Sequence, residues 1–207
     1  MRREPLRYLV VVLGLAVAAC SNNPPPPLTQ PPISFNDAKP FVFDVARVEI
    51  VTKFVTPSTP PHIEFQLAVS PENAAKRWVQ DRLQPKGTAG ILRVVINDAS
   101  ATETNIPKDP NKSVLDLNNV DQTRIDMSLD VALQILDDRQ FVTAEVTGKA
   151  SRSRSLPTGI KLNERDKILH DMVIDLVRGW GQEVDPQIHN TFPKSVLVQR
   201  RSPPLGL

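Results

Sequence analysis

Residues 125–135 alternate between large apolar residues and polar or small ones, and this pattern limits the possible fold more than any other part of the chain. Successive side chains of a strand point to opposite faces of a sheet, so a strand with this period buries one face and exposes the other. The apolar set is Ile125, Met127, Leu129, Val131, Leu133 and Ile135, and the intervening set is Asp126, Ser128, Asp130, Ala132 and Gln134. We therefore expect a sheet with one covered face and one polar face.

Further strands are predicted on both sides of this one. Residues 91–102 begin as a nearly unbroken apolar run, as a central strand would. After a turn at 137–140, apolar and polar residues alternate again from Val142 to Ala150, which predicts an antiparallel return. An earlier strand begins near Phe41, and its alternation changes phase at Ala46-Arg47. That change predicts either a bulge there or a strand buried on both faces.

A first helix is predicted after Ser70-Pro71-Glu72, which supply an N-cap, a proline at the first helical position and an acidic first turn. Trp78 is expected on its buried side, and Lys86-Gly87 is expected to end it. This places one helix between the first strand and the three that follow.

A second helix is predicted near the C-terminus, where apolar residues recur at helical spacing from Leu169 to Phe192, with Trp180 in the core. Asn163 and Asp166 resemble a capping box at its start. Gly179 and Gly181 are expected to weaken it. Because an interior proline costs about 3 kcal/mol, Asp185-Pro186 is expected to begin a fresh turn.

The predicted order is strand, helix, three strands, helix. Alternating elements of this kind predict an α+β fold, with an antiparallel or mixed sheet of about four strands and two helices packed on one face.

The N-terminus has the pattern of a signal peptide over residues 1–19. Three arginines precede an apolar run of about a dozen residues, which is shorter than the roughly 20 that a membrane-spanning helix needs. The run ends in Val17-Ala18-Ala19-Cys20, which resembles the lipobox of bacterial lipoproteins. That resemblance implies cleavage between Ala19 and Cys20 and acylation of the Cys20 thiol. The alternative is that Cys20 is only a small residue at the end of an ordinary signal peptide.

Cys20 is the only cysteine, so after acylation the chain has no thiol for a disulfide or a cysteine-based metal site. Residues 20–40 are expected to be a proline-rich tether that lifts the domain about 50 Å from the bilayer. A proline-rich ligand for a recognition domain is the alternative reading of this segment. A globular domain is expected at 41–195 and a loose tail at 196–207.

The charge balance gives no reason to expect nucleic acid as a partner. Removing residues 1–19 takes away three arginines and one glutamate, which leaves 22 basic and 22 acidic side chains. A nearly neutral mature chain lacks the basic excess that nucleic-acid binding requires.

The residues that could carry chemistry do not form a recognisable site in the sequence. His62, His170 and His189 are not spaced as metal ligands, and His170 is expected to be a solvated helix residue. Gly87 and Gly90 are too close together to form a phosphate loop. Asp126 and Asp130 share a strand face, and Asp137-Asp138 lie in a turn. These carboxylates are either solvent-exposed residues without a catalytic role or a pair for acid–base catalysis. We expect no catalytic residue, no metal and no cofactor, and hence no enzyme.

The segment from Lys149 to Ser155 has an unusual pattern, because arginines replace apolar residues on one face of the strand. Alternation puts Lys149 on one face and Arg152 and Arg154 on the other. These side chains are candidates for contact with lipid phosphates or with an acidic partner. The alternatives are a strand end projecting into water, or pairing with the aspartates of 125–137.

The element order, together with Ala75-Lys76-Arg77-Trp78 at the first helix, resembles the auxiliary lipoproteins of ABC-type envelope transport systems. Asp44–Glu49 and Ser151–Arg154 resemble uncharacterised proteobacterial lipoproteins. A serine, Ser21, follows the cysteine in place of an aspartate, and this choice of residue resembles that of outer-membrane lipoproteins. These resemblances imply an anchor in the bacterial cell envelope, facing the periplasm, at the outer membrane.

We therefore expect a membrane-anchored adaptor or accessory subunit of an envelope complex, such as one that transports lipid, with an envelope protein as its partner. One alternative is direct binding of lipid or glycolipid in a cleft between sheet and helices. Another is an envelope hydrolase with a site around His62, His170 or the Asp126/Asp130 pair.

Overall fold

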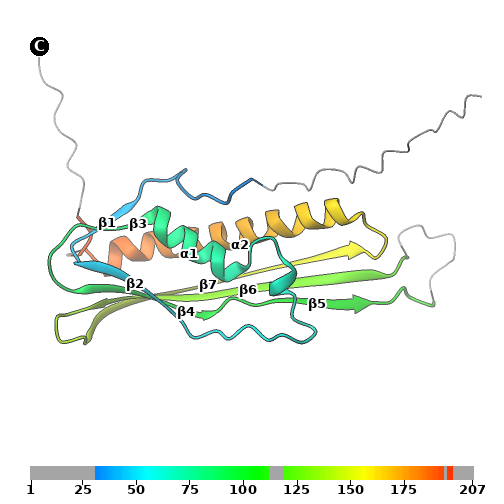
Figure 1. Ribbon diagram of the computed structural model, residues 1–207, viewed down its shortest axis with the longest axis horizontal. Helices are drawn as coiled ribbons and strands as arrows, with labels where there is room; N and C mark the ends of the chain where they lie inside the picture. The colour runs from blue at the N-terminus through cyan, green and yellow to red at the C-terminus, as the bar shows by residue number, and fades with distance from the viewer. Residues whose placement is uncertain (1–30, 112–118, 194, 198–207) are drawn as a thin grey trace, which may run out of the picture.

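Strand β6 (Gln122–Leu136) lies at the centre of the sheet in the computed structural model, which describes residues 31–111, 119–193 and 195–197. One edge of β6 pairs antiparallel with two strands: β5 (Ala101–Ile106) along its first half and β4 (Ile91–Asp98) along its second half. The other edge pairs antiparallel with β7 (Val142–Pro157), and β2 (Arg47–Thr52) pairs parallel with β4. The result is a mixed, five-stranded sheet (Figure 1).

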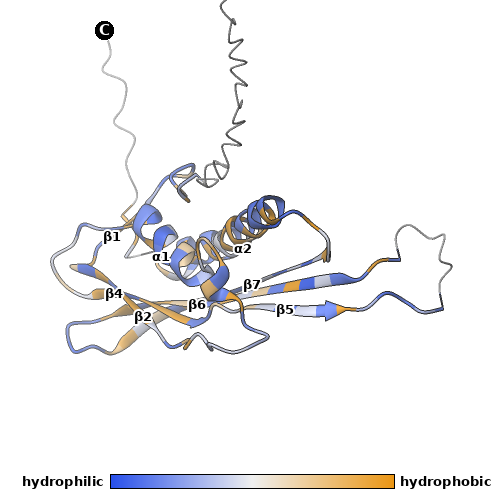
Figure 2. Ribbon diagram, turned by 45° about the vertical axis from the view of Figure 1, so that its right-hand side comes forward, coloured by the Kyte–Doolittle hydropathy of each residue, from blue (hydrophilic) through white to orange (hydrophobic). Residues whose placement is uncertain are grey.

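Helices α1 (Pro71–Arg82) and α2 (Leu162–Thr191) cover the same face of this sheet, as Figures 1 and 2 show from two directions. A 3-10 turn, η1 (Glu64–Gln66), precedes α1. The predicted α+β class, with two helices on one face of a mixed sheet, is confirmed. No helix in the described part of the chain is both long and apolar enough to span a bilayer.

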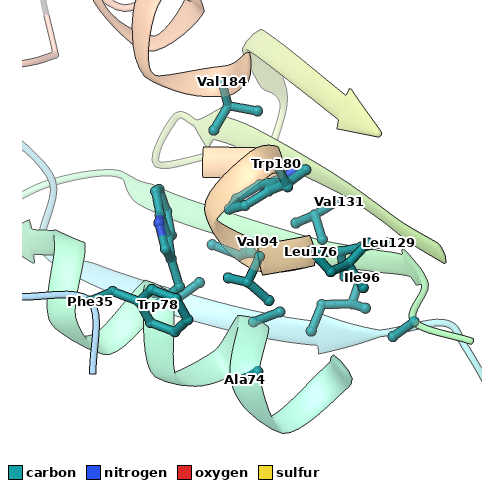
Figure 3. Close-up of a cluster of buried hydrophobic side chains, with 14 of the residues drawn as sticks. Phe35, Ala74, Trp78, Val94, Ile96, Leu129, Val131, Leu176, Trp180 and Val184 are labelled. Carbon is teal, nitrogen blue, oxygen red and sulfur yellow. The ribbon is translucent and has the colours of Figure 1, made fainter. Parts of the chain in front are cut away.

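The core lies between the sheet and the two helices. All six apolar residues of the alternating pattern in β6 are buried. Trp78 of α1 and Trp180 of α2 are at most 1% exposed and meet edge to face, with ring centroids 4.7 Å apart (Figure 3). Both tryptophans are therefore core residues, as predicted, and they join the two helices over the sheet.

The phase change at Ala46-Arg47 marks a change of sheet and not a bulge. β1 (Phe41–Phe43) pairs parallel with β3 (Leu83–Pro85) in a separate two-stranded sheet, and β2 begins at Arg47. The backbone N–H of Asp44 donates to the Ser195 carbonyl, and that of Ala46 donates to the Ala89 and Gly90 carbonyls. These bonds redirect the chain between the two sheets.

The single strand predicted over 91–102 is two strands, because the register with β6 shifts after Ile96. Helix α1 ends at Arg82, earlier than predicted, since Leu83–Pro85 leaves the helix to pair with β1. The N-cap prediction is confirmed: the Ser70 hydroxyl accepts from the Asn73 N–H at 3.2 Å.

Helix α2 differs from the prediction at its start and its end. It begins at Leu162 after Lys161, with no side-chain cap hydrogen bond, and it continues through Pro186 to Thr191. Val184 and Ile188 flank the proline and are fully buried, so packing offsets the cost of the missing N–H.

The glycines expected to weaken α2 are instead contact points. A Cβ on Gly179 would lie 2.2 Å from the Arg152 guanidinium, and one on Gly181 would lie 2.7 Å from the Trp78 indole nitrogen. A side chain at Gly181 would have to displace the buried Trp78 indole, whereas at Gly179 it would have to displace only the end of the Arg152 side chain.

The packed part of the chain extends beyond 41–195 at both ends. Ile33 and Phe35, within the expected tether, are 7% and 1% exposed, and the Phe35 N–H donates to Asp81 Oδ2 at 2.8 Å. Val196, within the expected tail, bridges Phe43, and the Leu197 N–H donates to the Val42 carbonyl. The signal peptide, Ala19, Cys20 and residues 198–207 lie outside the described residues.

Candidate interaction surface

The helix-free face of the sheet carries a network of paired polar side chains from β2, β4, β6 and β7. Asp130 accepts from Lys149 Nζ at 2.8 Å and from Asn97 at 3.1 Å. Arg124 Nε lies 2.9 Å from Asp126 Oδ2 and 3.1 Å from the Ser153 hydroxyl. The polar half of the alternating pattern therefore stabilises cross-strand pairs on an exposed face.

The two aspartates of β6 do not have the properties of an acid–base pair. Hydrogen bonding to Ser153, joined by the nearby Arg124 guanidinium, holds the pKa of Asp126 below its ordinary value. Burial would raise the pKa of Asp130, but the hydrogen bonds from Lys149 and Asn97 and the Lys149 charge lower it overall. Both carboxylates are therefore ionised at neutral pH, each with its own partners, and neither is poised to donate a proton.

The three histidines lie apart from one another in different surroundings. His62 Nδ1 lies 2.9 Å from Oε1 of the buried Glu64, which also accepts from the Ala101 N–H. His189 packs against the Phe41 ring, with centroids 5.1 Å apart. Within the described residues, no group of three or more metal-binding side chains is present.

The expectation that His170 is solvated is wrong. Its side chain faces inward from α2, it is 5% exposed, and neither ring nitrogen has a hydrogen-bond partner within the described residues. It lies in a run of buried residues, Leu169 to Val173, that is interrupted only at Asp171. The imidazole lies in the core because the apolar residues next to it on α2 are buried there.

The structure separates Lys149, Arg152 and Arg154 into two groups, as alternation predicted. Lys149 pairs with Asp130 on the polar face, which also raises the pKa of the Lys149 amine through that hydrogen bond. Arg152 lies against α2 and donates to the Asp175 carbonyl at 2.9 Å. Arg154 is exposed and makes no ion pair within the described residues. Neither arginine contacts the aspartates of β6.

Strand β7 runs to Pro157 and forms an edge of the sheet. The sequence predicted a clear return strand from Val142 to Ala150 and placed Lys149 to Ser155 on alternating faces as the strand leaves the core, but it did not show that this stretch forms an edge. The available signal was the continued alternation of short hydroxyl and long basic side chains. The outer edge of β7 over residues 145–155 is the candidate interaction surface, and we call it the β7 edge.

Several hollows on the surface are lined by described residues. Four of them have volumes of about 150 to 290 Å³ and are open to solvent. The one between α1, α2 and the N-terminal segment is about 150 Å³ and is lined by Phe35, Trp78 and Arg82. These volumes fall below the roughly 300 to 1,000 Å³ of sites that enclose small ligands.

Solved bacterial structures similar to this chain include the following three. A minor lipoprotein from Acinetobacter baumannii is 10% identical, with a TM-score of 0.36 over 70% of this chain and 91% of that one. Rare lipoprotein B from Shewanella oneidensis is 10% identical, with a TM-score of 0.36 over 70% and 97%. Two of the three are lipoproteins.

The third is a putative neuraminyllactose-binding hemagglutinin homolog from Helicobacter pylori, 10% identical, with a TM-score of 0.35 over 78% of this chain and 95% of that one. No family model and no curated protein matches the sequence. Likenesses at these identities and scores do not establish a shared function.

Proposed function

We propose that this chain is a lipid-anchored lipoprotein of the bacterial envelope that acts as a non-catalytic adaptor or accessory subunit. The anchor is the acylated Cys20, and the proline-rich segment after it links the bilayer to the folded domain. In this proposal the domain faces the periplasm from the outer membrane and holds an envelope protein, in a complex that transports lipid.

The observation that carries the proposal is the filled interior between the sheet and the helices. Phe35, Trp78 and Trp180 occupy the space above β4 and β6, and each is at most 1% exposed. A lipid chain bound there would have to displace these side chains from a close-packed core. The interior therefore favours a protein that works through its surface over one that carries lipid inside.

The polar face gives weaker support to a hydrolase than to an adaptor. Asp126 and Asp130 are each held ionised by their own hydrogen-bonding and charged partners. His62 is paired with Glu64, away from the β6 carboxylates. The candidates named for an envelope hydrolase therefore lie apart from one another and do not converge on one site.

The test is crosslinking and affinity capture of the lipidated protein from envelope membranes, with a Cys20→Ser variant as the control. We expect metabolic palmitate labelling of the wild type, loss of the label in Cys20→Ser, and recovery of one defined envelope protein with the acylated form. Copurifying lipid in stoichiometric amounts, with no protein partner, would instead support carriage. An unlabelled wild type would remove the basis of the proposal.

A further inference from the structure

The direction of the backbone groups on β7 follows from the strand pairing. In an antiparallel pair, residues two apart direct both N–H and C=O to the same neighbour. The Ser128 N–H donates to the Ser100 carbonyl, so even-numbered residues of β6 face the β4/β5 side and odd-numbered residues face β7. Leu129 pairs with Ala150 and Val131 with Gly148. The even residues of β7 therefore face β6, and the odd residues face outward.

The outward residues form a long row of backbone donors and acceptors. They are all exposed, and within the described residues their amides have no acceptor: Glu145, Thr147, Lys149, Ser151, Ser153 and Ser155. Of their carbonyls, that of Ser151 accepts from the Arg152 guanidinium at 2.8 Å. The row spans about 34 Å at 3.4 Å per residue. An edge of this length is a template for an added strand.

Helix α2 stands in the way of a second copy that would pair antiparallel with this edge, because both helices would then lie on the same face of the joined sheet. It lies over β7 (Figure 1). Trp180 Nε1 donates to the Gly148 carbonyl, and Gly179 lies against Arg152. Two copies paired through β7 would bring two such helices over strands about 4.8 Å apart. Packed helices need about 8 to 10 Å between axes. The edge therefore accepts a strand that has no helix above it.

The charges beside the edge select the composition of that strand. On the helix side of the edge, Arg152 and Arg154 carry two positive charges and make no ion pair within the described residues, whereas Lys149 on the other face is paired with Asp130 and Glu145 begins the edge. Arg152 and Arg154 are two residues apart, so both project to the helix side, where alternate residues of an added strand would also project. Acidic residues at every second position of the strand would meet them.

We infer that the β7 edge binds an extended acidic segment of a partner protein by adding it to the sheet as a further strand. This inference rests on the proposed adaptor function, because it names the surface and the kind of segment through which the partner is held. In this inference, Arg152 and Arg154 contact acidic side chains of that polypeptide. If the two arginines instead bound lipid phosphates, this inference would be wrong.

The test uses the full lipidated chain in detergent and a fluorescein-labelled peptide, Thr-Val-Glu-Val-Glu-Val-Glu-Val-Thr, with lysine in place of glutamate in a second peptide. Fluorescence anisotropy should show binding of the acidic peptide that weakens with added salt, and about tenfold weaker binding of the lysine peptide. Equal affinity for both peptides, or no binding of either, would overturn the inference.

The decisive variants change one outward amide. Ser151→Pro removes an N–H that faces away from β6, where proline is tolerated on an edge strand. Ser151→Ala keeps that N–H, and the Ser151 hydroxyl makes no hydrogen bond within the described residues. We expect Ser151→Pro to bind the acidic peptide about tenfold more weakly and Ser151→Ala to stay within about twofold of wild type. Equal effects of the two variants would contradict strand addition.

If circular dichroism shows that Ser151→Pro does not fold, two charge-reversal variants test the inference instead. Arg154→Glu should weaken the acidic peptide at least fivefold, whereas Lys86→Glu, exposed beyond β3, should not. Vesicles with anionic lipid that bind the domain through Arg154, with no peptide binding, would assign the arginines to phosphate. Peptide binding without any captured envelope protein would leave the edge intact and contradict the adaptor function.

Discussion

Gly148 lies where α2 crosses β7, and its position shows how single residues set the helix–sheet distance. A Cβ there would lie 2.3 Å from Val184 Cγ1 and 2.8 Å from the Trp180 indole nitrogen. The same indole donates to the Gly148 carbonyl at 3.1 Å. The strand thus approaches the helix closely enough for a side chain to bond its backbone.

Gly148→Ala is expected to destabilise the fold by about 1–3 kcal/mol, since the methyl group must push Trp180 and Val184 apart. Gly159→Ala is the matched control, because nothing lies within 4 Å of a Cβ there. The control should stay within about 0.5 kcal/mol of wild type. Urea unfolding followed by circular dichroism measures both, and equal effects in the two variants would show that the Gly148 contact is not tight.

Helix α2 shows how an element can override the local preference of its residues. Pro186 lies inside it, yet the helix continues to Thr191. The Arg82 guanidinium of α1, only 8% exposed, holds Asp185 at 2.8 Å beside the proline. Contacts with α1 and the sheet thus keep the last turns helical despite one missing hydrogen bond.

Pro186→Ala is therefore expected to stabilise the protein by about 1–3 kcal/mol, as it restores an N–H donor and removes the ring clash. Pro186 is exposed, so little packing is lost. The exposed Gln182→Ala, one turn earlier, serves as the comparison and should change stability by less than about 0.5 kcal/mol. Denaturant titration decides the sign, and a destabilised Pro186→Ala variant would mean that the proline is required to shape the helix.

At the scale of the whole molecule, one core joins segments from Ile33 to Val196. Phe35 reaches this core from a segment whose composition predicts only a spacer. It is 1% exposed beside α1, whereas Phe65, also before α1, is 75% exposed. The same residue type thus belongs to the core in one place and to the surface in the other.

We expect Phe35→Ala to lower the free energy of unfolding by about 3–5 kcal/mol, because it leaves a cavity among packed side chains. Phe65→Ala should cost less than about 1 kcal/mol. Trp78 and Trp180 fluorescence and far-ultraviolet circular dichroism should give coincident transitions, as a single core requires. A Phe35→Ala variant as stable as Phe65→Ala would place the start of the domain at Phe41 after all.

The sequence by itself determined the elements whose residues repeat with a regular period. Alternation at 125–135 gave the central strand and its covered face, helical spacing placed Trp78 and Trp180 in the core, and Ser70 marked the start of α1. These features are local, since each depends on which face of one element is buried. The lipid anchor at Cys20 stays a prediction from sequence.

Only the tertiary structure decided the features that depend on contacts between distant segments. Leu83–Pro85 became a strand because β1 was available to pair with it, and His170 entered the core because its neighbours on α2 are buried. The free edge of β7 follows from its pairing with β6 on one side only. Pairing and burial are properties of two segments at once, so no period within one segment reveals them.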